Sequence, residues 1–216
     1  MATSVDICNL ALAQLGSDAS VTSIKPPDGA NAGHCARFYP MALRKLFEEF
    51  DWSFAQARVR LGKLNDIDTE LYGYQYAYSW PSDAVKIVKI ARASDAEHDN
   101  FWHFPEQEID VNYRTVMYNG NRSRMVLCNI DDAIVHYIAY VDSPSLFPTY
   151  FTQALVLLLA SYLVGPIKRS DSASQMAQNL NTAYESALVR AKSLDAQSAR
   201  HKKNVRIPSN IKSRWV

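Results

Sequence analysis

NAGHCARFYPMALRKLFEEFDWSFA, residues 31–55, is the stretch that decides the fold of this 216-residue chain. Its apolar side chains recur at steps of three or four residues, which is the spacing of one face of an α-helix. They are Cys35, Phe38, Ala42, Leu43, Leu46, Phe47 and Phe50. Pro40 lies inside this pattern and has no backbone N–H, so we expect a kink rather than a break. The aromatic exit at residues 51–55 predicts that a buried helix leads without a linker into a sheet. No part of the stretch has the features of a reactive centre, which favours a scaffold or assembly role.

Three more helices are predicted on either side of this stretch. The first covers residues 3–16, where Thr3 and Asp6 have the spacing of a capping box and Gly16 suits the left-handed residue after a helix. The second covers residues 149–164 and is expected to stop at Gly165-Pro166. The third covers residues 170–199 and has the most regular apolar stripe of the chain.

After Ala55 the period of the apolar residues changes from 3.6 to 2, which is typical of β-strands. The firmest hairpin joins residues 115–118 to residues 125–128 through Asn119-Gly120, a dipeptide that favours a tight β-turn. Residues 134–141 form the last predicted strand. Together these strands predict one small antiparallel sheet inserted between the helices.

These elements predict a mainly α protein, an antiparallel helical bundle with an inserted small antiparallel β subdomain and an extended C-terminal tail. Residues 1–55 form the first half of the bundle, residues 56–142 the β subdomain, residues 143–199 the second half and residues 200–216 the tail. A chain of 216 residues is long enough to bury one such core.

The composition is that of a soluble globular protein, with 48% apolar and 21% charged residues. The longest apolar run, residues 154–167, has 14 residues. A membrane span needs about 20, so we expect no membrane segment. Cys8, Cys35 and Cys128 lie far apart and are odd in number, which favours free buried thiols in a reducing cytoplasm.

The charge is distributed unevenly along the chain. Six of the 23 basic residues and none of the 22 acidic residues lie in residues 200–216, so this tail carries +6 and the rest of the chain −5. Apolar residues, Trp215 among them, alternate with the basic ones. A solvated tail has no use for such anchors, and a nucleic-acid arm explains the charge better than it explains the anchors. A segment that docks on a partner protein accounts for both.

Five aromatic residues alternate along one predicted strand in the manner of a stacking platform for single-stranded nucleic acid. They are Tyr72, Tyr74, Tyr76, Tyr78 and Trp80. No Lys or Arg occurs between Asp66 and Val85, so this run brings no partners for phosphate groups. We therefore expect the rings to pack in a core or an interface.

Candidates for catalytic or metal chemistry are few. The chain has no Walker A, dinucleotide-binding, G-x-S-x-G or C-x-x-C motif. His98, Asp99 and His103 are close in sequence, but their spacing matches no standard zinc site. Glu48-Glu49 and Asp131-Asp132 offer paired carboxylates of the kind that glycosidases use, although adjacent acids more often form a solvated face. We expect no catalytic residue, no metal and no cofactor, and hence no enzyme.

The chain resembles a family of phage proteins in four places. They are VDICNLALAQLG (residues 5–16), SIKPPDG (residues 23–29), the helix that begins at Asn31, and WSFA (residues 52–55). These segments are similar to the head-to-tail adaptors of short-tailed bacteriophages, the tail tubular protein A type. The resemblance covers about the first quarter of the chain in detail, and beyond it only the order of elements matches. It implies a structural virion protein that forms a ring, usually dodecameric, between the portal protein and the tail nozzle. DNA would pass through the ring without sequence readout.

In this family the C-terminal segment reaches toward the portal ring, so the resemblance implies that the tail of this chain binds the portal. The portal-binding residues would be Arg200, Lys202, Lys203, Val205, Arg206, Ile207, Pro208, Ile211, Lys212, Arg214, Trp215 and Val216. Phe101 and Trp102 would belong to a loop on the tail side, where the nozzle and a tail fibre or tailspike bind. The protein would be made in the host cytoplasm and reside at the head–tail interface of the virion. Two alternatives stay open, a nucleic-acid-binding module that uses the basic tail and a tail-associated cell-wall hydrolase.

Overall fold

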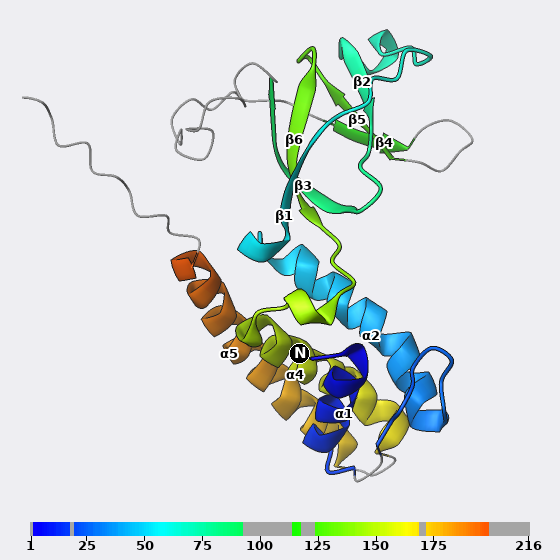
Figure 1. The fold of residues 1–216 in the computed structure, drawn as a ribbon, viewed down its shortest axis with the longest axis vertical. Helices are drawn as coiled ribbons and strands as arrows, with labels where there is room; N and C mark the ends of the chain where they lie inside the picture. Colours follow the sequence, from blue (N-terminus) through cyan, green and yellow to red (C-terminus); the bar gives the residue numbers. More distant parts are fainter. Residues whose placement is uncertain (1, 18–19, 93–113, 118–123, 169–171, 199–216) are drawn as a thin grey trace, which may run out of the picture.

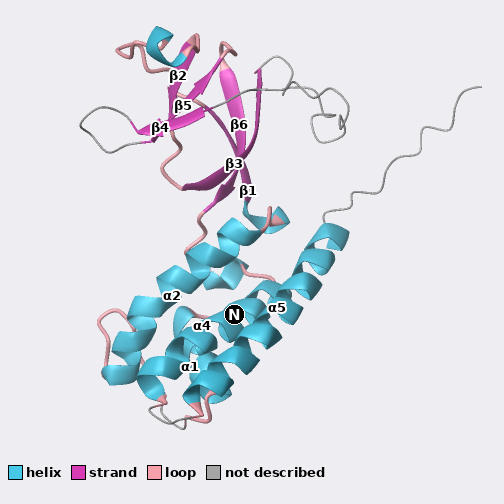
Figure 2. Ribbon diagram, turned by 180° about the vertical axis from the view of Figure 1, so that it is seen from behind, coloured by secondary structure: helices cyan, strands magenta, loops and turns pink. Residues whose placement is uncertain are grey.

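The computed structural model describes residues 2–17, 20–92, 114–117, 124–168 and 172–198 (Figure 1). Within these ranges it contains a layer of helices and, beside it, a β part made of two antiparallel sheets (Figure 2). The helices are α1 (Ser4–Gln14), α2 (Ala30–Glu49), α4 (Thr149–Ile167) and α5 (Ala173–Ser198). The strands are β1 (Gln56–Arg60), β2 (Tyr76–Ser79), β3 (Ala84–Arg92), β4 (Arg114–Met117), β5 (Arg124–Cys128) and β6 (Ala133–Ala139). Short 3₁₀ turns are η1 (Ser53–Ala55), η2 (Glu70–Tyr72) and η3 (Pro144–Leu146).

The prediction of a mainly α protein built as a helical bundle is wrong. Of the described residues, 52% are helical and 21% lie in strands, so the fold is mixed α/β. The strands form two three-stranded sheets, in the orders β1-β6-β3 and β2-β5-β4, where one small sheet was predicted. The physical reason is that apolar residues from both sheets, such as Tyr78, Val126 and Val135, bury one another in a hydrophobic cluster of their own. The β part thus has a core that is separate from the core of the helices.

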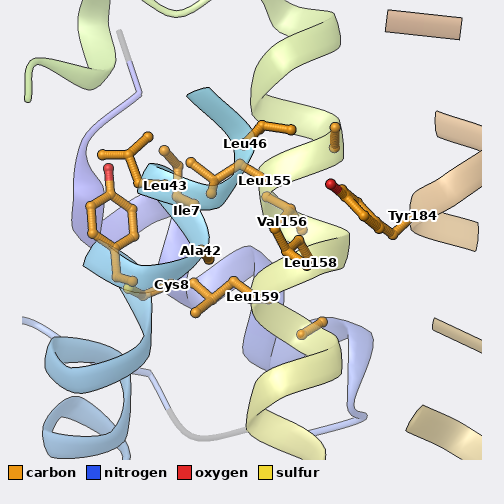
Figure 3. Packing of buried hydrophobic residues seen from close by; sticks show 14 of the residues in the cluster. Ile7, Cys8, Ala42, Leu43, Leu46, Leu155, Val156, Leu158, Leu159 and Tyr184 are labelled. Carbon is orange, nitrogen blue, oxygen red and sulfur yellow. The ribbon is translucent and has the colours of Figure 1, made fainter. Parts of the chain in front are cut away.

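Helix α4 is the centre of the helical layer, and α1, α2 and α5 all pack against it. Nine of its 19 residues are buried. Figure 3 shows Leu155 and Leu159 of α4 among Ile7 of α1 and Leu43 of α2, with Tyr184 of α5 on the other side. Among the described helices, α4 alone is long and apolar enough to cross a membrane by length and composition. Here it has the surroundings of the core helix of a globular protein.

The helix ends follow the sequence signals with one exception. The predicted capping box is present, since the backbone N–H of Thr3 donates to the Asp6 carboxylate at 2.8 Å and the backbone N–H of Asp6 donates to the Thr3 hydroxyl at 3.1 Å. Helix α2 runs through Pro40 without a break. The expected stop at Gly165-Pro166 is wrong, because α4 continues to Ile167 and the N–H of Lys168 still donates to Val164 at 2.8 Å. A proline removes only its own donor, so the helix can end one turn later.

The strand predictions are confirmed in part. The predicted hairpin is confirmed as β4 and β5, with Thr115 opposite Val126, while its turn lies outside the described residues. The tyrosine run forms a strand only from Tyr76 onward, since Tyr72 ends the turn η2. Register shifts in β3 let both Ile87 and Ile90 be buried, which a strict period of two does not allow.

The aromatic exit of residues 51–55 packs on α4. Trp52 is fully buried, and its indole N–H donates a 2.6 Å hydrogen bond to the carbonyl oxygen of Leu46 in the last turn of α2. The ring centroids of Trp52 and Phe54 lie 5.1 Å and 4.9 Å from that of Phe151, in edge-on contacts. This cluster fixes the direction in which the chain leaves α2 and enters β1.

Candidate functional site

A buried carboxylate holds together three parts of the chain at the C-terminal end of α5. Asp195 is 1% exposed. Its carboxylate accepts hydrogen bonds from the backbone N–H of Ser53 at 2.8 Å, from the Ser53 hydroxyl at 2.9 Å and from the Tyr150 hydroxyl at 2.7 Å. We call these three residues the Asp195 node. A buried carboxylate is costly unless donors surround it, and here three donors do so.

The node joins elements that are far apart in sequence. Ser53 is in η1, immediately before β1, Tyr150 is in the first turn of α4, and Asp195 is in the last turn of α5. Burial, and then the hydrogen bond to Asp195, raise the pKa of Tyr150 above its usual value, so its hydroxyl stays protonated and donates. Nearby, Lys192 lies 4.0 Å from the Glu49 carboxylate at the end of α2. The last two turns of α5 are therefore fixed to the junction between the helices and the β part.

Asp195 was missed by the sequence analysis, although the chain contained a signal for it. The buried residues of α5 are Leu180, Tyr184, Leu188, Ala191 and Asp195, which follow one another at steps of three or four. An acid that continues an apolar helix stripe is the pattern to look for. Leu194, the apolar residue directly before Asp195, is exposed instead.

A shallow groove runs along the outer side of the α4–α5 pair. Its volume is about 660 Å³, and its lining is Ser161, Ala177, Gln178, Asn181, Thr182 and Glu185. Glu185 is the one charged residue of the lining, and its carboxylate accepts a 3.0 Å hydrogen bond from the Asn181 amide. Small, uncharged side chains thus dominate this surface.

The residues assigned to binding sites from the sequence lie outside the described residues. This holds for the twelve portal-binding residues between Arg200 and Val216 and for Phe101 and Trp102 of the tail-side loop. The described chain ends at Ser198, one turn of helix after the Asp195 node.

The acidic pairs considered for hydrolysis serve as partners of surface cations. Acid and base pair as Glu48–Arg44 at 3.2 Å, Glu49–Lys192 at 4.0 Å, Asp131–Lys63 at 3.4 Å and Asp132–Arg60 at 2.9 Å. The four acids are partly or fully exposed. Ion pairs of this kind are ordinary surface interactions. Among the described residues no group of three His, Cys, Asp or Glu side chains is placed to hold a metal ion.

Of the five histidines, His34 and His136 are described. His34 is partly buried in the first turns of α2. His136 lies on β6 and is 4% exposed, so its side chain is buried. Burial, followed by the positive charge of Arg58, lowers its pKa to about 4, so its imidazole is neutral at pH 7.

The aromatic run packs inward, as predicted. Tyr78 is buried, and its hydroxyl donates to the carbonyl oxygen of Ile130 at 2.8 Å. Two of these rings make cation–π contacts with basic residues from other parts of the chain. The Lys63 ammonium lies 4.3 Å from the Tyr76 ring centroid, and the Arg124 guanidinium lies 5.4 Å from that of Trp80. The local sequence did not reveal these pairs because they depend on the pairing of strands.

Cys8, Cys35 and Cys128 are free and buried, as expected. Comparison of the chain with models of protein families and with curated proteins finds no match.

Proposed function

We propose that this chain is a structural virion protein, a ring-forming head-to-tail adaptor that joins the portal of a short-tailed phage to the tail nozzle. Its basis in sequence is the resemblance of residues 5–16, 23–29 and 52–55 to that family. The observation that carries the proposal is the Asp195 node, which holds the end of α5 directly before the basic tail.

A fixed starting point helps a tail that must dock on a partner. Because Asp195 binds both Ser53 and Tyr150, the last turn of α5 is tied to the first turn of α4 and to η1, directly before β1. The tail then begins at a defined place on the subunit, which reduces the conformational freedom lost on docking.

The energetics favour docking from a ring over docking of a single chain. Ordering the 17 residues from 200 to 216 costs about 1–2 kcal/mol each in backbone entropy. Burial returns about 1.5–3 kcal/mol for each apolar anchor. The five anchors are Val205, Ile207, Ile211, Trp215 and Val216. One tail is thus a weak ligand, whereas many tails presented together gain from their high effective concentration.

In this proposal the helices form the ring wall and the β part faces the nozzle, with a fibre or tailspike as a further partner. The ring is a dodecamer in the virion, and DNA passes through its lumen without sequence readout. Residues 200–216 bind the portal.

The test is to mix the chain with its cognate portal ring and to image the mixture by electron microscopy. An added ring layer beneath the portal is expected with the full chain and not with a chain truncated after residue 199. Trp215→Ala and Val216→Ala, which remove anchors but keep the charge of +6, separate docking from charge attraction. A ring layer that forms equally well without residues 200–216 contradicts the role of the tail.

The nucleic-acid alternative makes a different prediction for the same variants. A basic arm with six phosphate contacts binds duplex DNA with a log–log salt slope of about −5. Binding that depends on residues 200–216 with this slope, combined with no ring layer on the portal, would replace the adaptor proposal.

A further inference from the structure

Two buried thiols from different helices are in direct contact. Cys8 is in α1, and Cys35 is in the second turn of α2. Neither side chain has any exposed surface, and both belong to the hydrophobic cluster that joins α1, α2 and α4 (Figure 3). A hydrogen bond joins the two thiols, so no other side chain separates their sulfur atoms. Folding thus brings together two cysteines that are 27 positions apart in the sequence.

The hydrogen bond makes the two thiols chemically different. The thiol of Cys8 donates to the sulfur of Cys35, and this bond, together with burial, raises the pKa of Cys8. The same bond lowers the pKa of Cys35, against the effect of burial. The thiolate is the nucleophile in thiol–disulfide exchange. Cys35 is therefore the thiol that reacts first, and Cys8 is the second thiol beside it.

The third cysteine has different surroundings. Cys128 is on β5, in the separate core of the β part. Its thiol donates to the carbonyl oxygen of Ile130 at 3.7 Å. All three cysteines of the chain lie within the described residues, and Cys8 and Cys35 are the two that share a core. Cys128 therefore serves as an internal control for any reaction of the pair.

We infer that Cys8 and Cys35 form an intramolecular disulfide bond when the protein passes from a reducing to an oxidising environment, and that this bond locks α1 onto α2. Disulfides are rare in the cytosol and persist outside it. A virion protein makes this passage when the host cell lyses. The biological setting thus rests on the proposed function, whereas the chemistry of the pair does not.

The oxidant is a low-molecular-weight disulfide such as oxidised glutathione. The thiolate of Cys35 attacks one sulfur of the reagent, its S–S bond breaks, and one molecule of the reduced reagent leaves. Cys8 then loses its proton and attacks the Cys35 sulfur of this mixed disulfide, which releases the second reduced molecule. In total the two cysteines lose two protons and two electrons, and the reagent takes them up as two thiols.

Helix α1 has to open before a reagent can reach either thiol. Besides its capping box, α1 is held by the side chain of Asn9, whose amide nitrogen donates to the carbonyl oxygen of Val21 at 3.0 Å. Its amide oxygen accepts from the N–H of Val21 at 2.8 Å. A helix near the end of the described chain opens at a lower free energy than the core as a whole. Oxidation of the native protein should therefore be slow, and its rate should follow the opening of α1.

The disulfide should stabilise the protein once it has formed. It closes a loop from residue 8 to residue 35, which removes conformational freedom from the unfolded chain. It also ties α1 covalently to α2, so α1 no longer opens independently. The midpoint of urea unfolding should consequently be higher for the oxidised chain than for the reduced chain and should return to the reduced value after treatment with dithiothreitol.

Incubation of the reduced full-length chain with oxidised glutathione tests this directly. Two of the three thiols should be lost, and the intact mass should fall by about 2 Da with no glutathione attached. Peptide mass mapping should find residues 8 and 35 linked. Cys128→Ser should behave like the parent chain, whereas Cys8→Ser should stop at a glutathione adduct on Cys35. Thermal melting confirms that each variant is folded, and the linked peptide from the parent chain provides a readout that needs no variant.

The route through α1 has its own test. Asn9→Ala removes both hydrogen bonds to Val21, so α1 should open more often and the disulfide should form about tenfold faster. Gln14→Ala changes an exposed residue of the same helix and should leave the rate unchanged. Equal rates for Asn9→Ala and the parent chain would overturn the route through α1.

Three results would overturn the disulfide itself: three thiols that all persist in the folded protein, glutathione that stays on Cys35 while Cys8 remains free, or a bond that involves Cys128. Each of them leaves the adaptor role intact, because this assay contains no portal. A linked pair in a chain that adds no ring layer to the portal supports the disulfide and contradicts the adaptor role.

Discussion

The hydroxyl of Tyr150 donates a 2.7 Å hydrogen bond to the carboxylate of Asp195, which lies 45 residues later in the chain. This bond joins the first turn of α4 to the last turn of α5 and so closes the antiparallel pair at one end. Ser53 donates twice to the same carboxylate, which adds the start of the β part to the connection. One buried acid thus fixes the C-terminal end of α5, which ends at Ser198.

Removing this acid should destabilise the protein strongly. Asp195→Ala leaves the donors of Ser53 and Tyr150 without their acceptor, and we expect the free energy of unfolding to fall by about 2–4 kcal/mol. Asp195→Asn keeps one acceptor oxygen and should lose less. Urea unfolding measures both, and Glu185→Ala, an exposed acid on the same helix, should stay within about 0.5 kcal/mol of the parent chain. Equal losses at Asp195 and Glu185 would contradict the role of the node.

The indole N–H of Trp52 should contribute measurably to stability. It donates to the carbonyl of Leu46, one of the last four carbonyls of α2, which have no N–H partner within the helix. Trp52→Phe keeps most of the buried ring but loses this donor, so we expect a loss of about 1–3 kcal/mol in the free energy of unfolding. Trp80→Phe removes a 3.1 Å bond to Ala84 at a half-buried site, where water can replace it. Urea unfolding should therefore show a smaller loss in the free energy of unfolding for Trp80→Phe than for Trp52→Phe.

The stability of the protein should fall on acidification in a range set by His136. Its pKa in the folded state, about 4, is below the unfolded value of about 6.5, because burial and Arg58 disfavour the imidazolium. The unfolded chain binds the proton first, so stability is full above about pH 6.5 and is lost as the pH falls toward 4. The loss amounts to about 3 kcal/mol. Chemical unfolding at a series of pH values should show this loss in the parent chain, and His136→Gln should lack that component. If the stability of His136→Gln falls with pH in the same way as that of the parent chain, His136 is not the cause of the loss.

The three thiols should react only when the protein opens. Cys8, Cys35 and Cys128 are buried, and burial raises the pKa of Cys128. A hydrogen bond with Cys35, together with burial, raises the pKa of Cys8, and the same bond lowers the pKa of Cys35. All three thiols have no exposed surface, so a reagent reaches them only after the structure opens. In a colorimetric thiol assay the native protein should show no fast phase, and all three thiols should react in denaturant. A fast phase of one thiol in the native state would mean that this cysteine is accessible, and it would contradict this prediction.

The helices could be predicted because their signals are local. The period of apolar residues, the capping box at Thr3 and the glycine at position 16 act within one or two turns, and the structure has α1 and α2 where those signals place them. The end of α4 was misjudged at Pro166, since a proline near a helix terminus costs only one hydrogen bond.

The sheets could be predicted only in part. The hairpin of β4 and β5 is a local pairing, so its strands are found in the sequence. The division into two sheets is not local, because β6 pairs with β1, more than 70 residues earlier, and with β3. Which strands become neighbours depends on long-range burial, and a prediction of one sheet inside a bundle was therefore wrong.

The sequence by itself determined the elements: four amphipathic or apolar helices, the β-rich middle, the buried thiols and the opposite charges of body and tail. Only the tertiary structure decided that Asp195 is buried among three donors and that His136 is enclosed. The physical reason is the separation along the chain over which each interaction acts. Periodicity and capping act between residues a few positions apart, whereas burial of a polar group depends on partners that folding brings together from distant parts of the chain.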